Sequence, residues 1–556
     1  MHAIESKSRR VELLSFLVLF AGVLAAAVTL VTIVRTHVPL FSGDYEQVFF
    51  RAAQLKHGEI SVADFVFRRQ VDHPHFIVFG LAYLDLTFFG GRAWLLYAAS
   101  FAFCIAMVVT VAMTVRRSGL DRSASLVVSG LSAFLLFGPQ NMGILSWPFQ
   151  VTLIGTASLV LTASYLLAYD HQPRGAITAC LLLGIAVVSH GAGVLIIPVL
   201  VVFALVTRSK RYGIVAGLLA VEFVIYAAHY PTTPHIRLSA IMAKMIHAPS
   251  EWIGIPAYVA YLLGHGITFG LLGSVVDVLI GAVGLCAYFA SVVRFLLFKK
   301  GSSHLLFIST FGLLACLTSI TLNIAYEDLR KATVNLSYFF ADRYLPWTAF
   351  FWIGTFTNTI SVLYAVRGGR ISPPMIGAMA TVFLVIASVP FIQKTDSVFL
   401  SRIAVMQNFG CLDKVSACVL SRAVGLPVDS ARPWSALVFG WQTEVGALNV
   451  PRPQSCSGGA QTLFARDSML DRGKFVQATN FSDVNWNRGI SRSRAGFFVK
   501  DAELLTDLSP CDIARFADGS VRGITAIDGR NVYVEGSALP DAVGYPALIQ
   551  ILRHWR

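Results

Sequence analysis

The feature that most constrains this chain is a series of apolar runs, several of them long enough to cross a lipid bilayer. A helix needs about 20 apolar residues to span the hydrocarbon core, because its backbone amides must all be hydrogen-bonded within the segment. The first run extends from Val11 to Val34, and only 13% of the residues are charged, against roughly a quarter in a soluble domain. This run is too long for a signal peptide and lacks a small-residue cleavage site. The sequence therefore predicts a polytopic α-helical membrane protein whose first helix is retained as an anchor.

Basic clusters between the apolar runs predict the topology. They are "KSRR" (7–10), "RRSGLDR" (116–122), "TRSKR" (207–211), "RFLLFKK" (294–300) and "RGGR" (367–370). The positive-inside rule assigns such clusters to short cytoplasmic turns. We expect about eleven spans, near residues 11–34, 92–115, 124–140, 148–169, 175–189, 192–206, 213–230, 274–298, 304–325, 345–366 and 374–392. The N-terminus is then cytoplasmic and the C-terminus lies outside, while 76–90 and 252–272 fit either a span or a helix lying on the membrane surface.

The same scatter of Lys and Arg excludes one class of partner. The net charge of +13 is not gathered on one soluble face, so no nucleic-acid partner is expected. The expected surroundings of the apolar helices are a lipid bilayer.

The character of the chain changes near Lys394, which divides it into a membrane domain (1–393) and a soluble domain (394–556). Apolar runs become shorter, and Asp-Gly pairs at Asp518 and Asp528 stand beside short segments of strand character. Asp-Gly favours tight hairpin turns, so we expect a β-rich extracytoplasmic domain. Four of the eight cysteines fall in it: Cys411, Cys418, Cys456 and Cys511. An even number in an oxidising compartment predicts two disulfides, for which 411 with 418 and 456 with 511 is one guess; free or metal-binding thiols are the alternative.

Polar residues gather on the predicted outer face. The first outer loop, about 35–75, carries Asp44 and Glu46 near its start and Asp72, His73 and His75 near its end. The later outer turns contribute Gln140, Asn141, Trp147, Gln150, His190, Arg330, Lys331, Arg343 and Tyr344. The main charges within apolar segments are Asp85, Glu222 and Asp277. A transporter would place polar groups along a path through the bilayer midplane, so this distribution favours chemistry at one interface.

These residue types suit transfer of a group from a lipid phosphate to a water-soluble acceptor. A carboxylate just beyond the first span, such as Asp44, has the chemistry of a general base that deprotonates an acceptor hydroxyl. Arg330, Lys331 and Arg343 can hold a phosphate leaving group, and Tyr344 offers a hydroxyl.

Each candidate also has a structural alternative. Asp44 can cap the amphipathic helix that begins near Tyr45. The pair in "DHPH" can bind a divalent metal together with Asp72, and Mg or Mn is the one cofactor that the sequence leaves open. In "ADRY", Arg343 can snorkel to the interface while Tyr344 and Trp347 join an aromatic belt. Trp147 and Gln150 can be packing residues, and His190 can be a helix-end histidine.

Several segments resemble one family of proteins. "GDYEQVFFRAAQL" after the first span, "VDHPHFIVFGLAYLDLTFFGG", the turn "QNMGILSWPFQ" and a late "ADRY" resemble the bacterial GT-C-type integral membrane glycosyltransferases, by order of features over residues 10–395. An extracytoplasmic domain after the last span is similar to their architecture. The resemblance implies sugar transfer, with inversion, from a polyprenyl-phosphate-linked donor to a cell-envelope glycan or glycolipid at the outer face of the bacterial inner (cytoplasmic) membrane.

The resemblance also implies roles for single residues. Asp44 corresponds to the acid of the first outer loop, although Glu46 and Asp72 compete for that position, and His73 would approach the donor or acceptor. Arg330, Lys331, Arg343 and Tyr344 would bind the donor phosphate. The expected contacts to sugar or acceptor are His75, Gln140, Asn141, Trp147, Gln150 and His190. The alternative function is an envelope polysaccharide polymerase or ligase, or a transporter without transferase activity.

Overall fold

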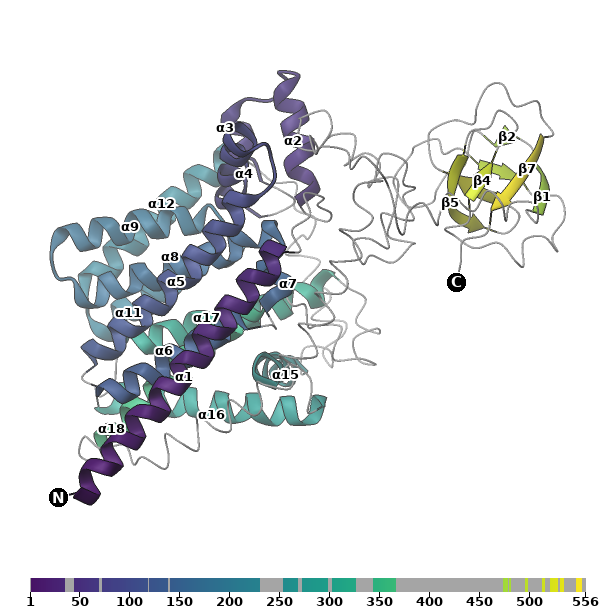
Figure 1. Ribbon diagram of the computed structural model, residues 1–556. Coiled ribbons are helices and arrows are strands. Elements are labelled where there is room, and N and C mark those ends of the chain that lie inside the picture. The colour runs from purple at the N-terminus through teal and green to yellow at the C-terminus, as the bar shows by residue number, and fades with distance from the viewer. Residues whose placement is uncertain are drawn as a thin grey trace. The chain divides into compact units, whose positions relative to one another are not determined.

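The computed structural model describes residues 2–35, 45–69, 73–118, 120–138, 141–230, 254–268, 273–298, 303–326 and 344–366, together with seven strands between 474 and 552. The chain divides into two compact units. The first unit comprises Met1–Arg35 and Gly58–Asp396, and the second comprises Thr36–His57 and Ser397–Arg556. The described part of the first unit is helical (Figure 1).

The helices of the first unit follow the apolar runs of the sequence. In chain order they are α1 (His2–Arg35), α3 (Val62–Phe67), α4 (Phe76–Phe89), α5 (Trp94–Arg117), α6 (Arg122–Phe137), α7 (Met142–Leu145), η3 (Pro148–Gln150), α8 (Val151–Tyr169), α9 (Pro173–Val187), α10 (Gly191–Val194), α11 (Ile196–Thr207), α12 (Lys210–His229), α15 (Ile255–Thr268), α16 (Ser274–Phe298), α17 (Ser303–Tyr326) and α18 (Leu345–Val366).

Every predicted span up to residue 366 coincides with a helix. The main differences are that α1 begins earlier, at His2, and that the predicted span 192–206 is interrupted at Leu195 between α10 and α11. The predicted span 374–392 lies outside the described residues. Six of the described helices are long and apolar enough to cross a membrane: those in 12–35, 94–117, 148–169, 210–229, 274–297 and 303–321. The first unit is thus a multi-pass helical membrane domain, as expected.

The first helix packs against α6 through two glycines. A Cβ on Gly22 would collide with the carbonyl oxygen of Gly130, and a Cβ on Gly130 would lie 2.5 Å from the carbonyl oxygen of Val18. The absence of side chains at both positions lets the two backbones touch, which is how small residues drive helix association in membranes. Thr29 Oγ1 adds a hydrogen bond of 2.6 Å to the Phe137 carbonyl at the end of α6. The two helices are thereby fixed together along their length.

The segment 76–90, which the sequence left between two possibilities, forms the 14-residue helix α4. At about 1.5 Å per residue it is roughly 21 Å long, less than the ~30 Å of a bilayer core. Asp85 lies near its end and is fully buried, and its carboxylate accepts hydrogen bonds from the backbone N–H groups of Ala93 (2.6 Å) and Leu95 (3.0 Å). The acid that the sequence suggested as an intramembrane charge therefore caps the start of α5.

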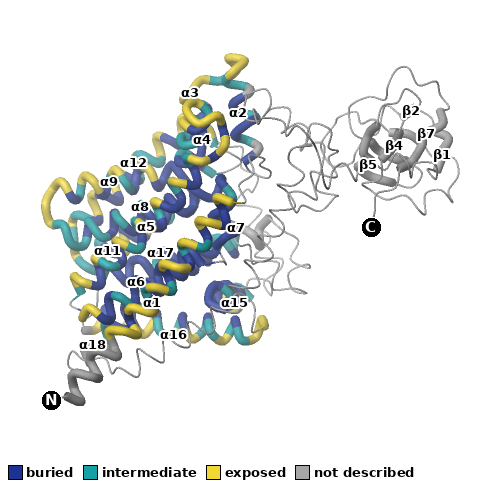
Figure 2. The backbone as a smooth tube through the Cα atoms, in the orientation of Figure 1, coloured by how far each residue is buried: buried dark blue, intermediate teal, exposed yellow. Residues whose placement is uncertain are grey.

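The outward faces of several helices are apolar and exposed. On α12 these residues include Val221, Val224 and Ile225, which are 59–65% exposed, and Figure 2 shows the contrast with the buried residues of α6 and α8. Apolar side chains on the outside of a helical bundle suit contact with lipid tails.

The second unit contains α2 (Glu46–Lys56) and an antiparallel sheet. The strands are β1 (Lys474–Ala478), β2 (Asn480–Phe481), β3 (Gly496–Phe498), β4 (Ile513–Arg515), β5 (Val521–Asp528), β6 (Asn531–Val534) and β7 (Ala547–Leu552). Their order in the sheet is β1-β7-β4-β5-β6-β3-β2. β5 and β6 pair with Asp528 opposite Asn531, and their register shifts between Ile524 and Ala526. The four cysteines of the predicted disulfides lie outside the described residues.

Candidate functional site

Three of the predicted site histidines meet at one end of the bundle, although they come from two distant segments of the chain. The rings of His73 and His190 are stacked, with centroids 5.9 Å apart and planes 12° apart. His75 lies edge-on to both, 6.2 Å from each ring centroid. We call these three residues the histidine cluster and the end of the bundle that holds them the histidine end.

Helix starts hold two members of the cluster in place. His75 is the residue before α4, and the first amide of that helix, Phe76 N–H, donates to the Val188 carbonyl at 3.1 Å. His190 precedes α10, and its Nδ1 accepts a hydrogen bond of 3.0 Å from the Ala192 backbone. The proton of a neutral His190 imidazole is therefore on Nε2. The helix-end role expected as an alternative for His190 is present, and it fixes which nitrogen can donate.

Glycine at position 191 lets His73 approach the start of α10. A Cβ on Gly191 would lie 2.6 Å from His73 Nδ1 and 3.1 Å from its Cε1, well inside van der Waals contact. Any larger residue would force the imidazole of His73 away from its present position.

Aromatic rings surround the imidazoles. Phe149 lies 4.9 Å from the ring of His75 and 6.5 Å from the ring of Trp147. Trp347, near the start of α18, lies 5.9 Å from His190 and is fully buried. The aromatic belt suggested for Trp347 is thus incorrect, because a belt residue lies at the lipid interface. Imidazole N–H groups beside flat aromatic faces suit a ligand with both oxygen atoms and apolar surface, as sugars and phosphates of lipid carriers have.

Two other predicted contacts have structural partners. Asn141 is buried, and its Nδ2 donates to the carbonyls of Leu135 (2.5 Å) and Leu136 (3.0 Å), the open carbonyls at the end of α6. Gln150 is buried, and its backbone N–H donates to the Trp147 carbonyl at 3.0 Å. Both residues shape the turn that carries Phe149.

Several predicted site residues lie outside the part of the chain that the structure describes. They are Asp44, Asp72, Gln140, Arg330, Lys331 and Arg343. Glu46 begins α2, in the second unit, and its side chain is not described. Tyr344 immediately precedes α18 and is half-buried.

The described residues do not form a metal centre. No group of three His, Cys, Asp or Glu side chains within the described ranges is arranged to hold a metal ion. The predicted metal set combined His73 and His75 with Asp72, and Asp72 lies outside the described residues. The Mg or Mn site therefore stays a prediction from the sequence.

A groove of about 600 Å³ opens on the first unit at the histidine end. It runs between α3 and α12, and its lining includes Phe67, Val188, Tyr226, His229 and Tyr230. Val188 connects this groove to the histidine cluster, because its carbonyl accepts the first amide of α4. The groove lies beside the exposed apolar face of α12, so a lipid chain can reach it from the bilayer.

Charged groups stand at the α3 side of this groove. Ser61 caps α3, and hydrogen bonds from its hydroxyl (2.7 Å) and its backbone N–H hold the pKa of the Asp64 carboxyl below its usual value. The guanidinium of Arg69 lies 5.0 Å from the ring of Tyr226, and the Tyr226 hydroxyl donates to the Phe67 carbonyl at 2.8 Å. These contacts tie the loop around α3 to the end of α12.

The sequence did not single out two parts of this end of the bundle. Phe149 was quoted only within "QNMGILSWPFQ", and nothing in the sequence marks it as the ring that faces His75. His265 was not considered, although it stands near the end of an apolar segment, where an imidazole is a useful signal. The structure pairs it with Asp277 at 3.1 Å.

Comparison with known proteins gives matches among solved structures alone. No protein-family model matches the chain, and no curated protein matches it. The oligosaccharyltransferase AglB of Archaeoglobus fulgidus, in complex with an inhibitory peptide and a dolichol-phosphate, is 14% identical with a TM-score of 0.39, over 79% of this chain and 60% of that one. Its structure with zinc and sulfate is 15% identical with a TM-score of 0.39, over 79% of this chain and 58% of that one. The present chain thus spans less than two thirds of these AglB chains.

A bacterial protein is also similar. ArnT of Cupriavidus metallidurans, bound to undecaprenyl phosphate, is 14% identical with a TM-score of 0.31, over 93% of this chain and 99% of that one. AglB and ArnT are both GT-C glycosyltransferases, the class that the sequence resembles. Because the identities are 14–15% and the TM-scores lie below 0.5, no residue and no activity is transferred from these structures to the present chain.

Proposed function

We propose that the chain is a membrane glycosyltransferase that moves a sugar from a polyprenyl-phosphate-linked donor to a cell-envelope glycan or glycolipid. The observation that carries the proposal is the histidine cluster, in which His73, His75 and His190 meet beside the rings of Phe149 and Trp347 at one end of a helical membrane domain. These groups suit a sugar phosphate, and they lie where a lipid carrier and a water-soluble acceptor can meet.

The basic turns stand at the other end of the bundle. Arg211 donates to the Asp170 carbonyl (2.5 Å), just before α9, whereas His190 follows the end of α9. By the positive-inside rule the Arg211 end is cytoplasmic. The histidine end is then extracytoplasmic, on the outer face of a bacterial inner membrane, and the domain 394–556 is proposed to be β-rich, to lie on that face and to carry two disulfides.

The groove between α3 and α12 supports a lipid-linked donor. Its lining is mainly apolar but includes Glu222 and His229, and it lies beside the lipid-facing surface of α12, which suits a prenyl chain. Val188 joins it to the histidine cluster. In the proposed reaction an acceptor hydroxyl attacks the anomeric carbon from the side opposite the phosphate, which gives inversion. The sequence assigns the phosphate to Arg330, Lys331, Arg343 and Tyr344.

Few acidic side chains remain for a path across the membrane among the described residues. Asp85 caps α5, and Asp277 is bonded to His265 near the end of a helix pair. Of the three acids that the sequence placed within apolar segments, only Glu222, on α12, then has no such structural role described above. The distribution supports transfer at one interface over transport.

The test is glycosyl transfer by the full chain, purified and placed in lipid nanodiscs. Radiolabelled polyprenyl-phosphate sugars are offered with envelope glycan or glycolipid fractions as acceptors. His73→Phe keeps a ring to stack on His190 but removes both nitrogens, and losing a hydrogen-bond donor to the sugar phosphate should lower transfer by roughly two orders of magnitude. Inversion is checked by the anomeric configuration of the product.

The matched control is His171→Phe, a histidine at the Arg211 end, which should transfer at the rate of the unmodified chain. Absence of transfer by the unmodified chain with every donor, or full transfer by His73→Phe, would reject the proposal. Unfolding temperatures of both variants show whether a loss of transfer is a loss of folding.

A further inference from the structure

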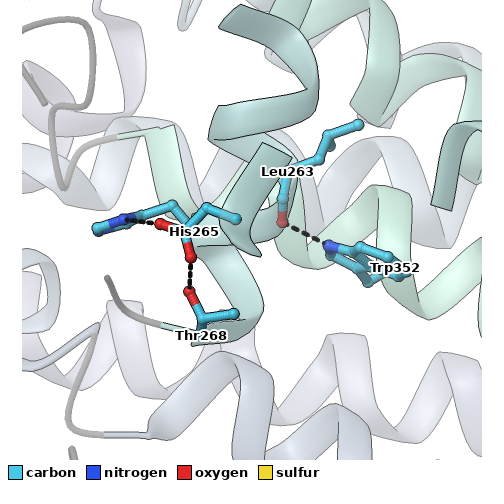
Figure 3. A network of polar contacts seen from close by, with 5 residues as sticks. Leu263, His265, Thr268 and Trp352 are labelled. Atoms are coloured by element: carbon cyan, nitrogen blue, oxygen red, sulfur yellow. Dashed lines mark hydrogen bonds and ion pairs between the residues drawn. The ribbon is translucent and has the colours of Figure 1, made fainter. Parts of the chain in front are cut away.

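A second polar cluster lies in the pair of helices α15 and α16. Figure 3 shows His265 and Thr268 near the end of α15, with Leu263 and Trp352 beside them. Asp277, in the first turn of α16, bonds both: its Oδ2 lies 3.1 Å from His265 Nδ1, and its Oδ1 accepts from the Thr268 hydroxyl. The cluster thus joins the end of one helix to the start of the next.

Small residues bring the two helices close enough for these bonds. A Cβ on Gly264 would collide with the Asp277 backbone, and a Cβ on Gly281 would collide with the Ala260 carbonyl. The contacts pair 264 with 277 and 260 with 281, so the helices run antiparallel. This packing holds Asp277 against the last turn of α15.

The surroundings of Asp277 indicate which side chain carries the hydrogen between Asp277 Oδ2 and His265 Nδ1. Asp277 is fully buried, and an ionised carboxylate away from water requires hydrogen-bond donors at both oxygens. The Thr268 hydroxyl supplies one, and an N–H at His265 Nδ1, 3.1 Å from Oδ2, supplies the other in the tautomer that we infer. The lone pair of a neutral His265 imidazole is therefore on Nε2, in a side chain that keeps 15% of its surface exposed. The ring of Tyr261, 5.5 Å away, packs against the imidazole.

This cluster stands at the histidine end of the bundle. Gly266 approaches the Thr348 hydroxyl so closely that a Cβ would collide with it, and the preceding residue, Trp347, packs on His190. The indole N–H of Trp352 donates to the Leu263 carbonyl at 2.8 Å, which ties α18 to α15 (Figure 3). The start of α18 therefore has the histidine cluster on one side and the His265 pair on the other.

We propose that His265, oriented by Asp277 and Thr268, accepts the proton of a hydroxyl-bearing acceptor at the histidine end. The inference rests on the proposed function and names a base for it. His265 is the catalytic residue, whereas Asp277 and Thr268 are positioning residues that act through it.

The step balances without any further reactant. His265 Nε2 takes the proton of the acceptor hydroxyl, and the hydroxyl oxygen uses a lone pair to bond to the anomeric carbon of the donor sugar. The bond between that carbon and the phosphate oxygen breaks, and its electron pair leaves on the polyprenyl phosphate. The imidazolium, held by the Asp277 carboxylate, then releases its proton to water.

The test uses the full chain in nanodiscs and the transfer assay described above, as a function of pH. For His265→Ala we expect kcat/KM to fall by roughly 10² to 10⁴-fold and to recover in part when free imidazole is added. For Asp277→Asn the side-chain amide donates to Nδ1 and moves the imidazole proton to Nε2, so we expect a comparable loss without rescue by imidazole. Thr268→Val should shift the pH profile of kcat/KM while the KM for the donor stays constant.

The matched structural control is Trp352→Phe, which removes the neighbouring hydrogen bond to Leu263 and leaves the three polar residues intact. It should lower the unfolding temperature and leave the pH profile unchanged. Transfer by His265→Ala at the unmodified rate, or a loss that imidazole does not restore, would overturn the proposal. A loss of two orders of magnitude in Asp44→Asn with none in His265→Ala would assign the base to the outer loop instead. Transfer by the unmodified chain separates failure of this inference from failure of the proposed function.

Discussion

At the scale of single residues, the geometry of the histidine cluster depends on a position with no side chain. Gly191 is the neighbour of His190 in the chain and of His73 in space. The sequence analysis singled out His190, but the glycine that follows it sets how closely the two imidazoles approach. Positions that look like spacers can therefore control the site as strongly as the residues with chemistry.

Gly191→Ala should displace His73 without unfolding the protein. The new Cβ would stand 2.6 Å from His73 Nδ1, and a displacement of about 1 Å can lower a rate by roughly 10²-fold. The measurement is glycosyl transfer together with the unfolding temperature in detergent. Gly217→Ala is the control, since a Cβ there meets nothing within 4 Å; equal transfer by the two variants would contradict the prediction.

The cap of α3 gives a prediction about pH. In the folded state, bonds from Ser61 lower the pKa of Asp64 from 3.8, so the carboxylate contributes stability that is complete above the unfolded pKa. This contribution is lost as the pH falls through the lower folded value. Ser61→Ala should destabilise α3 by about 1 kcal/mol near pH 7, and the difference from the unmodified chain should narrow below pH 3.8.

Hydrogen exchange of the α3 amides, measured for both proteins from pH 7 downward and corrected for the intrinsic exchange rate, checks this prediction. If the difference in α3 protection between the two proteins stays constant or grows as the pH falls, the Asp64 carboxylate does not contribute to the stability of α3. Because Asp64 is only partly buried, the stabilising effect of its charge should also be smaller at high salt.

The sequence predicted which residues belong to the site, but it did not predict which residues contact them. The sequence proposed His73, His75 and His190 because polar residues beside apolar spans are costly and need a reason. It could not predict that Phe149 and Trp347 face them, because apolar residues are abundant in every span. His265 was missed because a single imidazole within "YLLGHGIT" shows its importance only once Asp277 is beside it.

At the scale of elements, helix pairs are held by complementary small residues. Gly22 with Gly130 joins α1 to α6, and Gly264 with Gly281 joins α15 to α16. Lipid tails are as apolar as leucine, so burying large side chains gives little preference between partners. The close approach of backbones supplies that preference.

Gly130→Leu should separate α1 from α6. Its Cβ alone would lie 2.5 Å from the Val18 carbonyl oxygen, and forcing extra atoms into a close-packed contact destabilises by about 1–3 kcal/mol. We expect a lower unfolding temperature in detergent, whereas Gly217→Leu, on the outer surface of α12, should leave it unchanged. Equal unfolding temperatures for the two variants would show that the contact contributes nothing.

The helices themselves followed from the lengths of the apolar runs, since hydrocarbon leaves the backbone few alternatives. The break at Leu195 between α10 and α11 did not follow, because the residues around Leu195 continue the apolar run of the sequence. The role of Asp85 was also hidden, since a capping acid and an intramembrane charge look alike in a sequence.

At the scale of the whole molecule, the orientation of the bundle is the main open prediction of the proposed function. The histidine end and the Arg211 end lie at opposite ends of α9. The proposed transfer reaction takes place at the histidine end.

Cysteine labelling tests this orientation. Glu59→Cys and Arg174→Cys place thiols at two exposed positions, one before α3 and one at the start of α9. In intact spheroplasts an impermeant maleimide should label Glu59→Cys, and it should label Arg174→Cys only after lysis. The unmodified chain gives the background from its own cysteines. The reverse pattern would place the histidine cluster in the cytoplasm.

The crossing of α1 and α6 also has a consequence for biosynthesis. The hydrogen bond between Thr29 and Phe137 spans 108 positions, and at roughly 5–20 residues per second a ribosome needs about 5–20 s to make that stretch. Throughout that interval α1 lies in the bilayer before α6 has packed against Gly22. A nascent chain of this protein therefore passes through a stage in which its earliest helix is available to other partners, such as insertion factors, before its own sixth helix takes the place.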